Sequence, residues 1–300
     1  MNPAATDYNA SRRTGALPPC ARALGLILCA GLFMGALGQV PARQSCLPPS
    51  AGSASLQQQV EIQRRRLSSS DEEERRCAVM SLGWMNRSDS SRAAIQALSD
   101  SSAIVRATAA RAVLSLPPDE GVAALLPLLK DKDEFVRQET AYALGATRSR
   151  RATTALLNIL ETEKSDGVRG AATVALGSIG DEAAVVPLSN TLNLRVGAPG
   201  LLNKIRRKKK NENEFVRRAA ATALGLIGSR AAVPALIAAL EDERAPDDVR
   251  REAARSLGLI GDPSAVAPLR AALTSRDPYL SRIAYEALRK IAPGEATRPT

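Results

Sequence analysis

The chain has 300 residues, of which 45% are hydrophobic and only 3% aromatic, so its core must be built mainly from Ala, Val and Leu. Its 41 Lys and Arg residues outnumber its 31 Asp and Glu residues, which gives a formal net charge of +10, and it contains no histidine. Without an imidazole, these residues cannot form a Ser-His-Asp or Cys-His nucleophile, a histidine-ligated zinc or iron site, or an imidazole proton shuttle.

Residues 1–42 have the features of a secretory signal peptide. Three arginines (Arg12, Arg13 and Arg22) precede an uncharged apolar run over residues 23–38, and small residues follow at positions typical of signal cleavage. The run is shorter than the about 20 residues that span a membrane, and it contains four glycines. We therefore expect an exported protein, periplasmic or extracellular. An uncleaved membrane anchor over residues 23–38 is the alternative.

Residues 43–54 form a short linker rich in Pro, Ser and Gly. Removal of the signal would leave two cysteines, Cys46 and Cys77, which are enough for one disulfide in an oxidising compartment. The alternative is two unpaired thiols, with Cys77 packed inside a helix.

Residues 56–67 are predicted to form an amphipathic helix. Its apolar positions are Leu56, Val60, Ile62 and Leu67, and its other side is rich in glutamine and arginine. We expect this helix to cap the open end of the repeats that follow, because terminal repeats need a polar outer face for solubility.

Residues 55–291 carry an internal repeat. A Val-Arg pair, replaced by Leu-Ser in the last copy, returns at intervals of 31, 32, 48, 33 and 31 residues. The pairs begin at Val105, Val136, Val168, Val216, Val249 and Leu280, and Glu74 extends the register one unit upstream. Each pair opens a stretch with Val, Ala and Leu at helical spacing, here called the VR-type helix. The period predicts an all-α fold, a right-handed α-solenoid of about seven helix pairs.

A second, companion helix follows each VR-type helix. Gly180, Gly228 and Gly261 are predicted to end VR-type helices in the left-handed conformation. Prolines are predicted near the starts of the companion helices, where a missing N–H costs little; these prolines are Pro127, Pro187, Pro234 and Pro268.

The pattern VRxxAAxALGxIG, followed by AVPxLxxxL, resembles HEAT repeats of the phycobilisome-lyase type. Five units carry its Leu-Gly pair, at Gly83, Gly145, Gly177, Gly225 and Gly258. The resemblance implies that the VR-type helices line the concave side of the solenoid and the companion helices its convex side. The repeat motif is specific for the fold but says little about activity.

The arginine of each repeat has two interpretations. The repeat arginines are Arg75, Arg106, Arg137, Arg169, Arg217 and Arg250. They could form a basic binding stripe, or they could pair with carboxylates in the turns between helices. We favour the second, because Asp100 and Asp131 each precede an arginine by six residues, and we expect each to pair with the arginine of its own repeat.

The interval of 48 residues contains an insertion of about 16 residues within 193–214. Its basic residues Lys204, Arg206, Arg207, Lys208, Lys209 and Lys210 form a basic loop. Such a loop could contact an acidic protein, anionic lipid head groups or another polyanion, or it could be solvated without a ligand. Residues 292–300 are a C-terminal tail.

No metal or cofactor site is predicted. The acidic clusters 71–74 and 241–248 lie at turns before helices, where carboxylates stabilise exposed N–H groups, and neither has the spacing of a calcium loop. A related group of helical-repeat hydroxylases holds iron with paired His and Glu ligands, which a chain without histidine cannot supply.

We therefore expect a noncatalytic protein-protein interaction scaffold outside the cytoplasmic membrane. The resemblance leaves open a lyase-like enzyme or a chaperone-like factor as the alternative. A binder of polyanions or nucleic acid through the basic loop is the third possibility, although few aromatic side chains are present for base stacking.

The partner-binding residues are expected on the concave side of the C-terminal third. Arg218, Arg251, Arg255 and Arg282 are predicted to bind an acidic segment of another protein or peptide, because guanidinium groups pair bidentately with carboxylates. Tyr142 is expected to contact the apolar part of this segment. The alternative is that these are ordinary exposed arginines in an arginine-rich chain.

Overall fold

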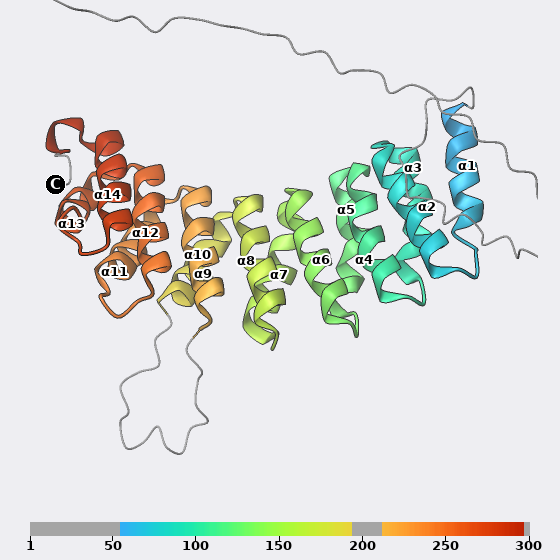
Figure 1. Cartoon of the computed structure of the whole chain (residues 1–300), viewed down its shortest axis with the longest axis horizontal. Coiled ribbons are helices and arrows are strands. Elements are labelled where there is room, and N and C mark those ends of the chain that lie inside the picture. The colour runs from blue at the N-terminus through green and yellow to red at the C-terminus, as the bar shows by residue number, and fades with distance from the viewer. Residues whose placement is uncertain (1–54, 194–211, 297–300) are drawn as a thin grey trace, which may run out of the picture. The chain divides into compact units, whose positions relative to one another are not determined.

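The computed structural model describes residues 55–193 and 212–296 (Figure 1). The predicted signal, the linker and the residues of the basic loop, Lys204 to Lys210, lie outside the described residues. All described residues belong to one compact unit, Gln44–Thr300. In these two described ranges the chain forms α-helices and short 3-10 helices and no strand, which confirms the all-α prediction.

Fourteen α-helices of the described residues form seven consecutive pairs, each with a companion helix followed by a VR-type helix. The companion helices are α1 (Leu56–Arg66), α3 (Ser88–Ala94), α5 (Pro118–Leu125), α7 (Thr153–Thr162), α9 (Val185–Leu192), α11 (Val233–Glu241) and α13 (Val266–Ala272). The VR-type helices are α2 (Glu72–Trp84), α4 (Ala103–Ala112), α6 (Glu134–Ala146), α8 (Asp166–Ile179), α10 (Glu214–Ile227), α12 (Asp247–Ile260) and α14 (Pro278–Ile291).

The ends of the VR-type helices are set by local sequence. Asp133 accepts hydrogen bonds from the N–H groups of Phe135 and Val136 at the start of α6, and such a cap satisfies donors that have no partner within the helix. At the other end, three glycines adopt positive φ angles near 70°, as predicted. They are Gly180, Gly228 and Gly261, which follow α8, α10 and α12.

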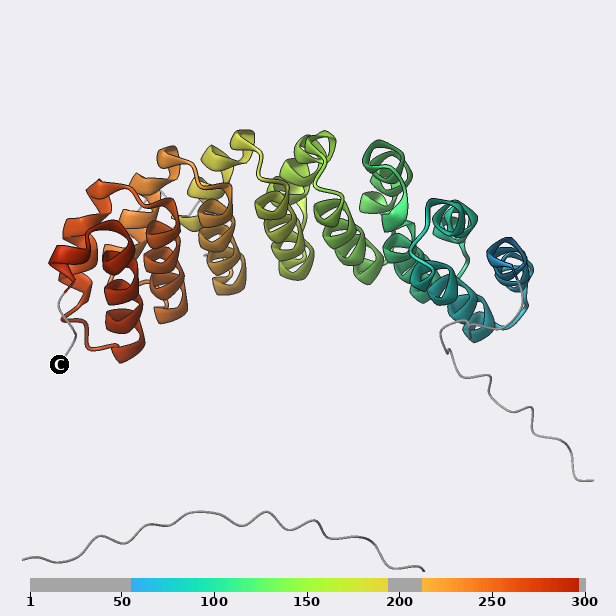
Figure 2. The ribbon, with the colours of Figure 1, turned by 90° about the horizontal axis from the view of Figure 1, so that it is seen from above.

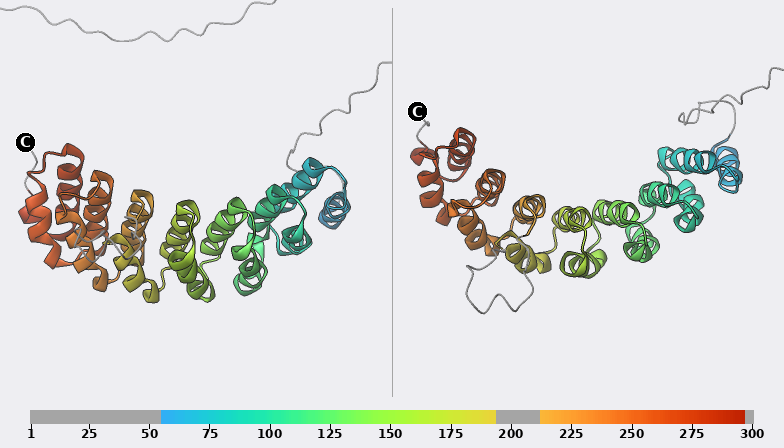
Figure 3. Two further views of the ribbon diagram at one scale, coloured as in Figure 1. Left: turned by 90° about the horizontal axis from the view of Figure 1, so that it is seen from below. Right: turned by 60° about the horizontal axis from the view of Figure 1, so that its bottom comes forward.

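The VR-type helices form the inner side of this unit. Each packs extensively on the next VR-type helix, whereas neighbouring companion helices touch each other sparsely. In Figure 2 the row of helix pairs curves, with the VR-type helices on the inside of the curve, and Figure 3 shows the same arrangement from two other directions. The facing implied by the resemblance to HEAT repeats is therefore the one observed.

The glycine of the Leu-Gly pair permits this close packing. A Cβ placed on Gly145 would lie 2.6 Å from the Cα of Ala175 on α8, and one placed on Gly177 would lie 2.7 Å from the Cα of Ala223 on α10. Real side chains do not approach so closely, so any larger residue would push two VR-type helices apart. The repeated Gly and Ala positions thus set the spacing of the VR-type helices.

Helix α1 packs less tightly than the sequence suggests. Its start is fixed by a capping box between Ser55 and Gln58, and Val60 and Leu67 pack against the core. Ile62, however, is 51% exposed, so its assignment to the apolar side was wrong. It follows Val60 by two residues, or about 200° around the helix, and therefore points away from the core.

Candidate functional site

Three of the repeat arginines, Arg75, Arg106 and Arg137, bind carboxylates of the following helix pair. Arg75 Nε lies 2.7 Å from Asp100 Oδ2, and Arg106 Nε lies 2.7 Å from Asp131 Oδ2. In both pairs Nη2 donates to the second carboxylate oxygen, which makes the contact bidentate. Arg137 binds Glu163 in the same way at 2.8 Å. We call these contacts the arginine ladder.

The expectation that Asp100 pairs with Arg106, the arginine of its own repeat, was wrong. Arg106 Nη1 instead donates to the main-chain oxygens of Asp100 and Ser101, at 2.9 and 3.1 Å. This leaves its Nε and Nη2 edge facing Asp131 in the next repeat. The same correction applies to Asp131, whose main-chain oxygen, not its carboxylate, binds Arg137. The arginines therefore tie consecutive repeats together.

The ladder continues in a changed form around the insertion. Arg169 Nη2 contacts Asp166 on its own helix at 2.7 Å and also Glu212. Arg217 is buried, and its Nε donates to the main-chain oxygen of Leu192 at the end of α9. These guanidinium groups are engaged inside the stack, so they do not form the basic binding stripe that was the alternative.

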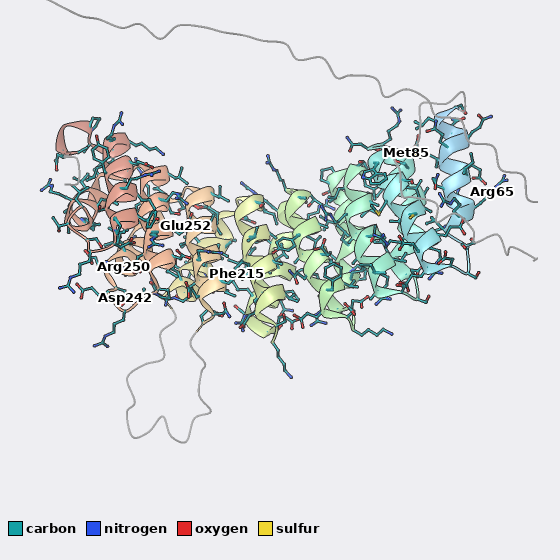
Figure 4. The ribbon with its side chains drawn as sticks, in the orientation of Figure 1. Arg65, Met85, Phe215, Asp242, Arg250 and Glu252 are labelled. Carbon is teal, nitrogen blue, oxygen red and sulfur yellow. The ribbon has the colours of Figure 1, made fainter. Side chains whose placement is uncertain are left out.

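A second row of contacts runs along the inner side, between consecutive VR-type helices. In four repeats the residue just before the repeat valine or leucine lies close to the residue two after the valine of the preceding VR-type helix. These pairs are Gly167 with Gln138, Phe215 with Gly170, Asp248 with Arg218, and Tyr279 with Arg251. The ring of Phe215 covers Gly170, and the Arg251 guanidinium lies 5.0 Å from the centre of the Tyr279 ring. Figure 4 shows Phe215 between α10 and α8. We call this set of residues the inner row.

The inner row opens into an apolar pocket at its N-terminal end. The pocket, with a volume of about 470 Å³, lies across α2, α4 and α6. Its large apolar side chains are Trp84, Ile104, Leu114 and Phe135, which are 46%, 37%, 40% and 46% exposed. The small residues Gly83, Ala107 and Ala112 complete its lining. Exposed large apolar side chains that gather in one place mark an interaction surface.

Charged side chains also line this pocket, namely Arg76, Arg111 and Glu139. Arg76 is held by Glu73, with Nη2 at 2.6 Å from Oε1. Arg111 is 74% exposed, and its Nη1 lies 3.9 Å from Glu139 Oε2. Such a long and solvated contact contributes little, so Arg111 can bind a carboxylate of another molecule at little cost.

The four predicted arginines of the C-terminal third all have carboxylate neighbours within the chain. Arg251 lies 2.7 Å from Asp277 and 2.9 Å from Asp248, and Arg218 lies 3.4 Å from Asp248. The other two pair within their own helices, Arg255 with Glu252 and Arg282 with Glu286. The structure thus brings Arg218 and Arg251 together around one carboxylate. Binding of an acidic partner by these four residues stays a prediction.

The remaining predicted residues occupy other environments. Tyr142 on α6 is half-buried and packs against the core, and its contact with a partner stays a prediction. Cys77 on α2 is disulfide-bonded. Cys46 lies outside the described residues, as do the six basic residues of the loop, so the pairing of Cys46 with Cys77 and the role of the loop stay predictions.

The described part of the chain contains neither a cluster of metal ligands nor a membrane-spanning helix. Across residues 55–193 and 212–296, no group of three or more Cys, Asp or Glu side chains is placed to hold a metal ion. The same ranges contain no helix with the length and apolar character required to cross a membrane.

The sequence interpretation missed the aromatic residues of the inner row and of the apolar pocket. Phe135 and Phe215 are two of only three phenylalanines in the chain, and both directly precede a repeat valine. Ile104 and Tyr279 occupy the equivalent position in other repeats. In a chain with 3% aromatic residues, this recurrence is a signal that alignment of the repeats reveals.

Four overlapping or adjoining segments of the chain match a known protein family. Residues 91–177, 122–194, 190–247 and 243–299 match the model of HEAT repeats. No curated protein matches the chain significantly.

Several solved structures are similar in fold. The CpcE–CpcF complex of phycocyanin lyase from a Nostoc species is 23% identical with a TM-score of 0.47, and the match covers 84% of this chain and 93% of that one. Human deoxyhypusine hydroxylase in complex with glycerol is 20% identical with a TM-score of 0.39, covering 77% and 84%. Kap121p is 17% identical with a TM-score of 0.50, covering 79% of this chain but only 29% of its own length.

At these identities the solved structures show a shared fold and no shared activity. The family match is stronger, because it extends over residues 91–299 and coincides with the stacked helix pairs described above. The chain therefore belongs to the HEAT-repeat family.

Proposed function

We propose that the protein is a noncatalytic binding module that holds another protein, or a segment of one, outside the cytoplasmic membrane. The observation that carries this proposal is the apolar pocket of Trp84, Ile104, Leu114 and Phe135 on the inner side of the first repeats. A solenoid exposes an extended inner surface, and exposed aromatic side chains in a pocket are the residues that most often dominate binding energy.

The pocket favours a segment with an apolar or aromatic anchor next to an acidic residue. Trp84 and Phe135 supply large surfaces for the anchor, and the exposed Arg111 supplies a partner for the carboxylate. The arginines of the C-terminal third, Arg218 and Arg251 above all, extend the same inner side and are proposed to contact the remainder of an acidic partner.

The location outside the cytoplasmic membrane is supported by the signal-like residues 1–42. Fractionation of cells, followed by mass measurement of the mature chain, tests this part. We expect the protein in the periplasmic or secreted fraction with its N-terminus after residue 38. A full-length chain in the cytoplasm would contradict export.

Binding is tested with variants of the pocket. The double substitution Trp84→Ala with Phe135→Ala should abolish recovery of a specific partner from the envelope fraction, because it removes both aromatic side chains of the pocket. The matched control is Leu226→Ala with Leu259→Ala, since these leucines are at least as exposed and each follows a repeat glycine, as Trp84 does. The control should retain the partner.

Equal recovery with both double variants would contradict the pocket as the binding surface. Recovery of a bound pigment or of nucleic acid in place of a protein would contradict the proposed function itself. Trp84 is the only tryptophan of the chain, so its fluorescence should shift on addition of the purified partner, which gives a direct measurement of affinity.

A further inference from the structure

The arginine ladder lacks a carboxylate at Arg250. Arg75 and Asp100 are 25 residues apart, as are Arg106 and Asp131. The residue 25 positions after Arg250 is Ser275, which has no charge to offer. Its hydroxyl oxygen accepts a hydrogen bond from the Asp277 N–H at 3.2 Å. At this one junction the sequence keeps the arginine and omits the acid.

No neighbouring carboxylate replaces the missing one. Arg250 Nε donates to the main-chain oxygen of Leu240 at 3.1 Å, and Arg250 forms no ion pair with any described residue. Asp277, in the same turn as Ser275, is bound by Arg251 at 2.7 and 2.9 Å and also caps α14. The N–H groups on the two terminal nitrogens of Arg250 therefore have no carboxylate partner in the described part of the chain.

Arg250 lines a pocket of about 960 Å³ between the last two helix pairs. Ser275 lines the same pocket, which places the arginine and the vacant ladder position in one cavity. Figure 4 shows Arg250 near the α11–α12 turn. Arg250 is half-buried, and a half-buried guanidinium binds a carboxylate more strongly than a fully solvated one does.

The wall of the pocket also carries negative charge. Glu241, Glu243 and Asp247 are exposed and line the cavity, and none of them forms an ion pair with Arg250. Arg251 and Arg276 line the cavity as well, and Arg251 is held by Asp248 and Asp277, so the lining carries both signs of charge. A ligand with both a carboxylate and a positively charged amino group satisfies both parts of the lining.

We propose that this pocket binds a carboxylate accompanied by an ammonium group, as in a free basic amino acid or in the C-terminal lysine of a peptide. The ligand carboxylate takes the ladder position opposite Arg250, and the ammonium group lies among Glu241, Glu243 and Asp247. The volume is within the range of pockets that hold small ligands. The site is separate from the apolar pocket and does not depend on the proposed function.

Calorimetric titration of the mature chain tests the proposal with three probes. The probes are L-lysine, an acetylated peptide ending in a lysine with a free carboxylate, and the same peptide with an amidated end. We expect L-lysine or the free-ended peptide to bind, which identifies the source of the ligand, and the amidated peptide to bind at least tenfold more weakly than its free-ended form. Absence of binding by both carboxylate probes at millimolar concentration would overturn the proposal.

Two substitutions act on the ladder position in opposite ways. Arg250→Gln removes the charge and should weaken binding at least tenfold. Ser275→Asp supplies the missing carboxylate, so it should raise the melting temperature and also weaken binding at least tenfold, because its own side chain then occupies Arg250. The matched control is Arg244→Gln, which removes an exposed arginine that precedes α12 and does not line the pocket.

Undiminished binding by Ser275→Asp would overturn the proposal even if Arg250→Gln failed to fold. The same conclusion would follow if Arg244→Gln weakened binding as much as Arg250→Gln, since the effect would then be one of net charge. The double variant Trp84→Ala with Phe135→Ala should bind the small probes normally, so failure of the proposed function is distinguishable from failure of this site.

Discussion

Arg106 and Asp131 illustrate how single residues hold this stack together. Their side chains are only 8% and 11% exposed, so both charges have lost most of their hydration. Two carboxylate contacts and two main-chain oxygens satisfy the guanidinium in return. Removal of one member leaves the other buried without its partner, and this outcome costs more than the pair contributes when intact.

The substitution Asp131→Ala should therefore lower the free energy of unfolding by about 2 to 3 kcal/mol. The control is Asp119→Ala, which breaks the exposed contact between Asp119 and Arg151 and should cost less than about 1 kcal/mol. Urea denaturation followed by circular dichroism measures both. Equal losses in the two variants would show that the ladder carboxylate is no more important than a surface charge.

Glycine positions give an independent test at the same scale. Gly145→Ala should destabilise the protein by about 1 to 3 kcal/mol, because the new methyl group would overlap Ala175. Gly121→Ala is the control, since a Cβ there meets its nearest neighbour at 3.8 Å and a helix interior favours alanine by about 0.5 to 1 kcal/mol. Destabilisation by both would indicate a general intolerance of larger residues rather than a close helix contact.

At the scale of the helix, the VR-type helices follow from the sequence because their signals are local. Val216, Ala220 and Leu224 recur at helical spacing and are fully buried, and the glycine caps stand where they were predicted. The companion helices are less regular: α3 and α5 continue as 3-10 segments, Ile95–Ser99 and Leu126–Lys130. Helix propensity and hydrophobic periodicity in the sequence do not distinguish an α-helix from a 3-10 helix.

Two features depend on contacts between repeats and were not predictable from one repeat alone. The spacing of six residues between Asp100 and Arg106 suggested a pair within the repeat, but stacking places the Asp100 side chain against Arg75. Likewise, Trp84 and Phe135 meet in one pocket although they are far apart in sequence and belong to α2 and α6. Which residues meet across repeats depends on the distance between helices. No local pattern in a single sequence gives that distance.

Helix α1 provides a prediction for an element as a whole. It contains no fully buried residue, yet it covers part of α2 and α3 at the end of the stack. Deletion of residues 43–68 should expose this end and cause aggregation or fraying of α2, because terminal repeats need a polar cover. Hydrogen exchange and light scattering measure the two effects.

The control for this deletion is Cys46→Ser, because the deletion also removes a cysteine. If the shortened chain remains monodisperse with normal protection of α2, the segment is a linker and not a cap. If Cys46→Ser alone reproduces the loss, the effect belongs to the cysteine and not to the helix.

At the scale of the whole molecule, the ladder determines the response to pH. Hydrogen bonds from Arg75 and Arg106 lower the pKa values of Asp100 and Asp131, and Arg251 lowers that of Asp277. A carboxylate with a lowered folded-state pKa contributes stability above its unfolded pKa, near 4, and this stability is lost as the pH falls through the lower folded value.

The melting temperature should therefore be flat from about pH 5 to pH 8 and fall below about pH 4. The chain contains no histidine, so no side chain of ordinary pKa changes its charge between pH 5 and pH 8. Calorimetry at a series of pH values, with Asp131→Ala compared at each, tests the assignment. The difference in melting temperature between the parent protein and Asp131→Ala should become smaller in acid. A step in the melting temperature between pH 6 and pH 7 would contradict the assignment to the ladder carboxylates.

The Gly–Ala contacts between VR-type helices also have a mechanical consequence. Backbones that already touch, as at Gly145 and Ala175, cannot be compressed further, whereas the companion helices meet only sparsely on the outer side. When such a stack bends, the VR-type helices therefore keep their spacing. The distances between companion helices on the outer side change instead. A partner seated on the inner side would then adjust the curvature of the protein by opening or closing gaps on the face it does not touch.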